Sequence, residues 1–144
     1  MVLFDVNVLV YAFRSDMPEH ERYKAWLEET LRSGAECGIA ELVLAAVVRI
    51  ATHTRIGRRP TPLGDALNFV DALRDHPACL IVAPGPRHWP IFTGLCKAAG
   101  VRGALVTDAY FAGLAIEHGA EWITTDRDYA RFPGLRWRHP LANS

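Results

Sequence analysis

The sequence predicts an α/β fold, in which a mainly parallel central sheet of about four or five short strands is flanked by helices. Two observations lead to this prediction. Short apolar runs of strand length alternate along the chain with longer segments of helical periodicity. The 144 residues, 50% of them hydrophobic, suffice for one domain with its own core. Because no low-complexity linker or repeat divides the sequence, we expect a single domain over residues 1–144.

The elements expected in the first part of the chain follow from apolar runs and turn residues. Residues 2–5 form an apolar run that ends in a carboxylate, which predicts a strand, and residues 7–13 continue into a turn and a short helix. Residues 19–33 place apolar side chains at helical spacing before a glycine. A brief strand at 36–40 leads to a helix at 41–54. That helix is apolar nearly all round, so we expect it to be buried.

The same alternation continues to the end of the sequence. A basic loop covers residues 55–62, and we expect Thr61 to cap a helix that has Pro62 at its first position and runs to about Arg74. The remaining expected elements are a strand at 79–83, helices at 87–99 and 107–118, a strand at 121–124, a polar loop at 125–134 and a last short strand near 135–137.

Composition and charge exclude several classes of protein. The 16 basic and 16 acidic residues balance, which argues against a generally cationic nucleic-acid coat protein but leaves local patches open. The 3 cysteines cannot all pair and match no zinc spacing, so we expect reduced thiols. The longest apolar runs are well short of the ~20 residues of a membrane span, and the first residues lack the cationic region of a signal peptide. We therefore expect a cytoplasmic protein with no membrane partner.

Four acidic side chains stand where a parallel sheet places functional groups. Asp5 closes the first expected strand, Glu41 follows the second, and Asp126 follows the strand at 121–124. In open α/β sheets, sites form at the carboxyl ends of the strands. Asp108 lies in the first turn of an otherwise apolar helix, where a lone carboxylate is costly unless it is paired, hydrogen-bonded or bound to a metal. We expect these acids to form one site.

Converging carboxylates without Cys or His ligands favour a hard cation, Mg²⁺ or Mn²⁺, over Zn²⁺. The chemistry that such a site supports is metal-assisted hydrolysis, most naturally of a phosphodiester, because the metal activates water and offsets the charge of the phosphate. Asp5, Asp108 and Asp126 are the candidate ligands. Each also has a purely structural alternative as a turn residue, a partner of a helix cap or an Asx-turn residue.

Weaker candidates surround these acids. Asn7 is either a hydrogen-bond donor of the site or a helix cap, and Thr125 and Asp128 either support the site or only shape their loop. Arginines cluster around a helix end with its following loop and around the last acidic loop. They are either solvated or in contact with phosphate, which arginine binds bidentately. The candidates for phosphate contact are Arg49, Arg55, Arg58, Arg59, Arg127 and Arg131.

Several segments resemble the motifs of a known family. Residues 3–11, 106–112 and 124–132 resemble the first, third and fourth motifs of PIN-domain ribonucleases. Residues 84–89 and 132–137 look like the VapC toxin branch of that family. Each motif alone is weak, but together they cover nearly the whole chain in the family's order.

The resemblance implies a Mg²⁺- or Mn²⁺-dependent endoribonuclease that is the toxin of a type II toxin–antitoxin pair. It also implies a homodimer and inhibition by a cognate antitoxin whose tail fills the active-site groove. Asp5, Asp108 and Asp126 carry over as acidic site residues, and the arginines above become candidate RNA contacts. The family's second acid is missing, because Ala46 stands at its position. Either Glu41 substitutes, which we expect through water or a hydrogen bond and not as a direct ligand, or the site uses three acids.

Two other functions are compatible with these residues. An Asp-dependent phosphatase or phosphotransferase would use Asp5 as its nucleophile, but Asn7 stands where such enzymes carry a second acid. Neither Lys24 nor Lys97 lies near a strand end, where the catalytic lysine of such an enzyme would be needed. A catalytically silent binding module with the same fold is favoured by Ala46 and disfavoured by the three intact acids.

Overall fold

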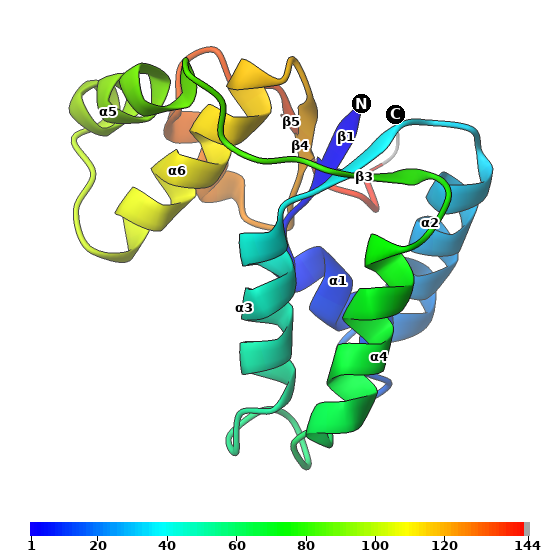
Figure 1. The fold of residues 1–144 in the computed structure, drawn as a ribbon. Helices are drawn as coiled ribbons and strands as arrows, with labels where there is room; N and C mark the ends of the chain where they lie inside the picture. The colour runs from blue at the N-terminus through cyan, green and yellow to red at the C-terminus, as the bar shows by residue number, and fades with distance from the viewer. Residues whose placement is uncertain (143–144) are drawn as a thin grey trace.

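The computed structural model describes residues 1–142 and has an α/β fold around a five-stranded sheet (Figure 1). The strand order is β3-β2-β1-β4-β5, and every neighbouring pair is parallel. This confirms the fold class that the sequence predicts. The strands are β1 (Val2–Phe4), β2 (Cys37–Ile39), β3 (Cys79–Ile81), β4 (Glu121–Ile123) and β5 (Trp137–Arg138).

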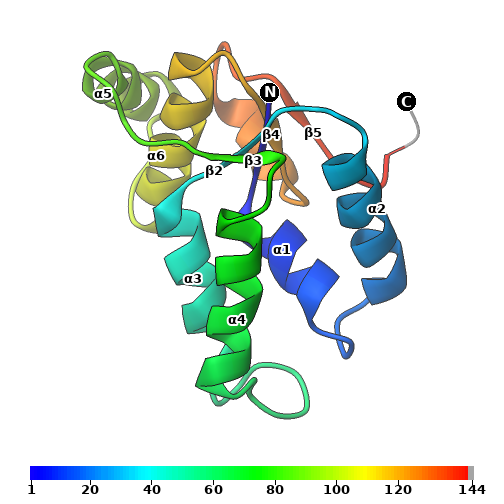
Figure 2. The ribbon, with the colours of Figure 1, turned by 45° about the vertical axis from the view of Figure 1, so that its right-hand side comes forward.

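The helices form two groups around the sheet. Helices α5 and α6 lie together on one side, whereas α1 to α4 gather away from them (Figures 1 and 2). Among residues 1–142, no helix combines the length and the apolar character that crossing a membrane requires. The helices are α1 (Val6–Phe13), α2 (His20–Arg32), α3 (Glu41–Ala51), α4 (Leu63–Arg74), α5 (His88–Ala99), α6 (Ala104–Glu117) and the 3₁₀ helix η1 (Arg127–Arg131).

The core lies at the centre of the sheet, because β1 and β4 are buried. Leu3, Phe4, Trp122 and Ile123 are each at most 1% exposed. The Trp122 ring stacks on Phe111 of α6, with ring centroids 5.5 Å apart. Strand β3 lies at the edge of the sheet and ends at Ile81, two residues earlier than expected, and Leu80 and Ile81 are 49% and 39% exposed. An apolar run therefore does not distinguish a central strand from an edge strand here.

Helix α3 differs from the prediction in length and in burial. It ends at Ala51, three residues early, and buries only one side, which includes Val43 and Val47. Leu42 is 52% exposed, and Ala45 is also exposed. The exposed side lines a cleft, which explains why this helix carries apolar residues nearly all round without being enclosed.

Two helix starts also differ from the prediction. Helix α4 begins at Leu63 with Pro62 as its N-cap, and Thr61 does not cap it. The Thr61 hydroxyl instead accepts a hydrogen bond of 2.8 Å from the guanidinium of Arg14. Helix α6 begins at Ala104, three residues earlier than expected, directly after Gly103. Gly103 has a φ of +62°, a backbone conformation that glycine adopts readily.

Candidate active site

The register of two parallel strands places Asp5 beside Thr124. Phe4 pairs with Ile123, so the next residue of each strand emerges at the same edge of the sheet. Asp5 caps α1, and its Oδ1 accepts the backbone N–H of Val6 at 2.7 Å. The hydroxyl of Thr124 donates to the other carboxylate oxygen, Oδ2, at 2.6 Å. Asp5 is therefore a buried carboxylate held at both oxygens.

The same threonine links Asp5 to Asp126. The backbone N–H of Asp126 donates to the Thr124 hydroxyl oxygen at 3.0 Å. Asp126 in turn caps η1, because its Oδ1 accepts the backbone N–H of Asp128 at 2.8 Å. The loop after β4 is thereby held against the end of β1. Sequence reasoning selected Thr125 for a supporting role, but it is Thr124 that makes both bonds.

Asp108 reaches the site from α6. The helix begins at Ala104, so Asp108 lies in its second turn. The sequence predicted the first turn. The hydroxyl of Tyr129 in η1 donates to Asp108 Oδ1 at 3.2 Å. Tyr129 is only 2% exposed, so its ring is held in the core. The Asp108 carboxylate is thus oriented by η1, the segment that directly follows Asp126.

These acids line one cleft of about 630 Å³ between α3 and α6, at the carboxyl ends of β1 and β4. The convergence of Asp5, Asp108 and Asp126 is what the sequence led us to expect. The wall contributed by α3 is apolar except for one arginine. The lining residues are Asp5, Val6, Asn7, Leu42, Ala45, Ala46, Arg49, Ile50, Ala104, Thr107, Asp108, Phe111, Asp126 and Tyr129.

Burial and mutual repulsion destabilise the ionised acids. Burial raises the pKa of Asp5 to about 6, against the lowering effect of its bonds to Thr124 and Val6, and the charges of Asp108 and Asp126 raise it further. Burial also raises the pKa of Asp108, and the hydrogen bond from Tyr129 counteracts this only in part. A bound cation would relieve the repulsion at both carboxylates.

The donor chemistry fits a hard cation, since three carboxylates supply oxygen ligands to one cleft. Hydrogen bonds orient all three carboxylates and leave lone pairs free on them. Within residues 1–142, however, no three or more His, Cys, Asp or Glu side chains already surround a metal position. Metal ligation by Asp5, Asp108 and Asp126 therefore stays a prediction.

Glu41 is not brought to this cleft, which corrects the expected contact with a bound metal. It is the first residue of α3, it is exposed, and its Oε2 lies 3.1 Å from Nε of Arg74 on α4. Five helical residues amount to about 140° beyond a full turn, so Glu41 and Ala46 lie on different faces of α3. Ala46 lines the cleft and Glu41 does not. Among the described residues that line the cleft, no glutamate takes the place of the acid that is missing at Ala46.

Of the three residues predicted to support the site, only Asn7 lines the cleft. Asn7 lines the cleft but does not cap α1, because Asp5 does. Thr125 is partly exposed and does not line the cleft. Asp128 is exposed, and its carboxylate lies 3.7 Å from Arg131.

The candidate arginines divide between the cleft and its surroundings. Arg49 lines the cleft on the α3 wall. Arg55, Arg58 and Arg59 lie on the loop that follows α3. Arg127 and Arg131 belong to η1, and the charge of Arg131 lowers the pKa of Asp108.

Sequence reasoning did not select Thr124, Tyr129 or Arg14. The strand register could have identified Thr124, since it pairs the ends of β1 and β4. Tyr129 could be suspected only as an aromatic residue three positions after Asp126, and the sequence shows nothing that directs its hydroxyl to Asp108. Arg14 has partners that are up to 47 residues away along the chain.

The fold is a parallel α/β sheet, and three acids line a cleft at the carboxyl ends of its strands. Residues 2–135 match the family described as the PIN domain, and the chain belongs to this family. The protein is similar to Ribonuclease VapC43 from Mycobacterium tuberculosis, with 43% identity over 141 residues that cover 98% of this chain and 96% of that protein. Ribonuclease VapC25 from the same organism is 38% identical over 140 residues, covering 97% of this chain and 99% of that protein.

Solved structures share the fold at low sequence identity. VapBC2 from Rickettsia felis, crystallised with a fragment of promoter DNA, contains a chain that is similar with a TM-score of 0.71 and 17% identity, covering 96% of this chain and 98% of that chain. VapBC-1 from nontypeable Haemophilus influenzae gives a TM-score of 0.70 and 15% identity, covering 99% of this chain and 100% of that chain. At these identities, the likeness supports the fold alone.

Proposed function

We propose that this protein is an endoribonuclease that hydrolyses RNA phosphodiester bonds with Mg²⁺ or Mn²⁺ and acts as the toxin of a type II toxin–antitoxin pair. One observation carries the proposal. Asp5, Asp108 and Asp126 come from separate parts of the sequence and line one cleft in a chain of the PIN domain family. The relatives named VapC ribonucleases support RNA as the substrate.

Each residue of the site has a definable task in this reaction. Asp5, Asp108 and Asp126 would hold the cation, which supplies an activated water and offsets phosphate charge when bound. Thr124 keeps Asp5 in place, and Tyr129 orients Asp108 through its Oδ1. Without a cation, the same acids would repel the phosphate, so we expect cleavage to require a divalent metal ion.

A protein antitoxin is the expected partner, since structures similar to this one include VapBC complexes and a toxin–antitoxin complex from Klebsiella pneumoniae. We propose that an arginine or lysine of the antitoxin reaches Asp5 and Asp108 and displaces the metal, because a cationic side chain would relieve their repulsion. A complex in which the antitoxin binds far from these acids would contradict this. The homodimer and the cytoplasmic location stay predictions.

The test is cleavage of total RNA by the purified protein with Mg²⁺, Mn²⁺ or EDTA. We expect cleavage with either ion, no cleavage in EDTA, and none with Asp108→Asn. Asp71→Asn is a matched control, because Asp71 is an exposed acid on α4, away from the cleft. A wild-type protein that is inert with every ion and RNA would favour the catalytically silent binding module.

A further inference from the structure

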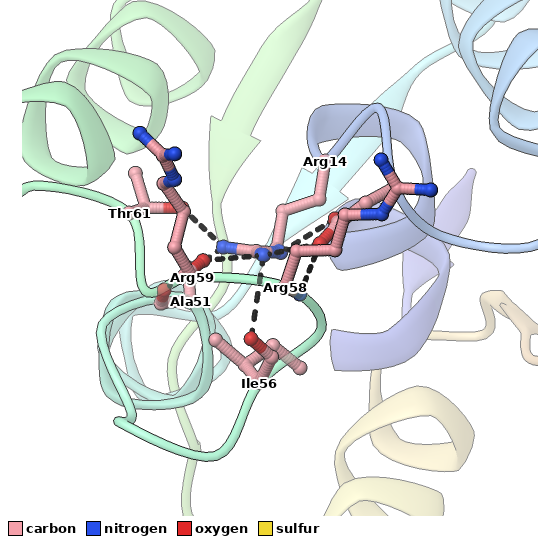
Figure 3. Close-up of polar contacts among 7 residues, drawn as sticks. Arg14, Ala51, Ile56, Arg58, Arg59 and Thr61 are labelled. Atoms are coloured by element: carbon pink, nitrogen blue, oxygen red, sulfur yellow. Dashed lines mark hydrogen bonds and ion pairs between the residues drawn. The ribbon is translucent and has the colours of Figure 1, made fainter.

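Arg14, directly after α1, is a buried arginine with every guanidinium nitrogen engaged. Its side chain is 6% exposed. Nη1 donates to the backbone oxygen of Ala51 at 3.3 Å and to the Thr61 hydroxyl at 2.8 Å, and Nη2 donates to the backbone oxygen of Arg59 at 2.7 Å (Figure 3). A weaker bond of 3.5 Å reaches the backbone oxygen of Ile56. One side chain thus holds both ends and the middle of the α3–α4 loop, residues 52–62.

Asp16 completes this arrangement. Its two carboxylate oxygens accept from Nε and Nη2 of Arg14 at 3.0 and 2.7 Å. Oδ2 also accepts the backbone N–H of Arg58 at 2.9 Å. Gly57 has a φ of +48°, and a Cβ at this position would collide with the Asp16 carboxylate. The loop therefore has one defined path past the Arg14–Asp16 pair.

The arginines that this loop presents lack acidic partners. Arg55, Arg58 and Arg59 are exposed, and the ion pairs of residues 1–142 include none of them. The side chains of Arg58 and Arg59 extend away from the Arg14 guanidinium on either side of it (Figure 3). Arg49, on the last turn of α3, lines the acidic cleft, and the α3–α4 loop begins three residues later. The loop arginines therefore follow, along the chain, the helix that forms one wall of the cleft.

We propose that the α3–α4 loop binds the backbone phosphates of the RNA substrate and that Arg14 and Asp16 are its positioning residues. The proposal rests on the proposed ribonuclease function. Unpaired guanidinium groups bind phosphate strongly and bidentately. A loop that is ordered before RNA arrives loses less conformational entropy on binding. Phosphates held beyond Arg49 would keep the strand in the cleft while its scissile bond lies at the acids.

The first test measures binding separately from cleavage. A labelled single-stranded RNA of mixed sequence is titrated in EDTA over a range of salt concentrations. The double variant Arg58→Ala with Arg59→Ala should bind about tenfold more weakly at low salt. Its plot of log affinity against log salt should be less steep by about 0.7 for each phosphate that the variant no longer neutralises. The control removes Arg22 and Arg32 on α2, which lowers the total charge equally and should leave the slope within about 0.3 of wild type.

The second test separates positioning from charge. Arg14→Lys keeps the charge but loses the planar fork, so the loop should loosen. Trypsin should then cut after Arg55 and Arg58 faster than in wild type, and the RNA affinity should fall although the net charge is unchanged. If this variant does not fold, Asp16→Asn replaces it, because it removes only the carboxylate that anchors Arg14 and the Arg58 N–H.

The outcomes distinguish this proposal from the ribonuclease function itself. Unchanged affinity and salt slope in the Arg58 and Arg59 double variant, in a protein that cleaves RNA, would overturn phosphate binding by the loop alone. Faster proteolysis with unchanged RNA affinity in the Arg14 or Asp16 variant would overturn the positioning role. Failure of the wild-type protein to cleave RNA would instead contradict the proposed function.

Discussion

The Arg14 cluster and the acidic cleft both bury charge, but only one of them balances it. Arg14 donates to a carboxylate and to oxygens of the α3–α4 loop, and the hydrogen bond from Arg14 lowers the pKa of Asp16. Asp5 receives only a hydroxyl and one N–H, and burial together with its acidic neighbours raises its pKa to about 6. In the Arg14 cluster, opposite charges are paired, whereas in the cleft, carboxylates of like charge face one another.

The difference distinguishes a structural cluster, around Arg14, from a functional site, the acidic cleft. A buried charge with a full set of partners holds its surroundings in one arrangement, and breaking such a set is strongly destabilising. Carboxylates that raise one another's pKa leave free energy available to a cation or a cationic side chain. Substitutions that change one region at a time test this difference.

Asp108→Asn should reduce RNA cleavage by at least about a hundredfold, because the charge that helps to hold the cation is lost. The fold should persist, since asparagine has the same shape and can still accept the hydrogen bond from Tyr129. Cleavage rates and circular dichroism measured on the same preparation check this. Full activity of Asp108→Asn would show that Asp108 is not needed for cleavage.

Arg14→Ala should lower the free energy of unfolding by about 3 kcal/mol, because hydrogen bonds from a buried cation to loop oxygens are lost. Urea denaturation measures the change. Arg32→Ala is the control, since that side chain is exposed on α2. Equal free energies of unfolding for both variants would mean that the Arg14 cluster does not stabilise the fold.

Asp5→Asn should stabilise the metal-free protein at pH 7 by on the order of 2–3 kcal/mol while abolishing cleavage. The pKa of Asp5 is about 6 in the folded state and 3.8 in the unfolded chain, so the folded state holds the extra proton between these values. Stability of the wild type therefore falls as pH rises from about 4 to about 6. Thermal melts in EDTA should show the advantage of the variant at pH 7 and its loss near pH 4. A constant difference across this range would contradict the assigned pKa.

Tyr129→Phe should leave the fold intact and raise the Mg²⁺ concentration needed for half-maximal cleavage about tenfold. The substitution removes only the hydroxyl that donates to Asp108 Oδ1, and the buried ring remains. Phe132→Tyr, also in the buried part of this segment, tests whether any change of aromatic residue has the same effect. Identical metal dependence of the wild type and Tyr129→Phe would show that the hydroxyl does not orient Asp108.

Glu41→Gln should leave cleavage unchanged at every Mg²⁺ concentration. Its carboxylate is exposed and paired with Arg74, outside the cleft. An exposed pair contributes little, so the melting temperature should change by no more than about 1 °C. If the activity of Glu41→Gln falls and then recovers at high Mg²⁺, Glu41 takes part in metal binding and this prediction is wrong.

The sequence predicts the parts of the site that depend on local patterns. Asp5 is recognisable because it ends an apolar strand, and Asp126 because it follows another. Parallel pairing then brings strand ends to one edge, which is sufficient to expect the cleft. Asp108 is recognisable because it is a lone charge in an apolar helix.

The remaining features depend on geometry that local patterns do not contain. The choice of Thr124 over Thr125 follows from the register of β1 and β4, which decides which residue faces Asp5. Glu41 was misplaced because its direction depends on how α3 is rotated against α4. The partners of Arg14 in the α3–α4 region lie 37 to 47 residues away along the chain, where no periodic pattern connects them.

The most direct test of the unbalanced acidic cleft is the melting temperature of wild type and Asp5→Asn at pH 7, with EDTA and with saturating Mg²⁺. In EDTA the variant should melt higher, because the wild type buries an ionised carboxylate beside two others. In Mg²⁺ the wild type should gain stability as the cation binds its folded state, and the variant should gain much less. An advantage of the variant that is the same with and without Mg²⁺ would contradict the claim that these acids form a cation site.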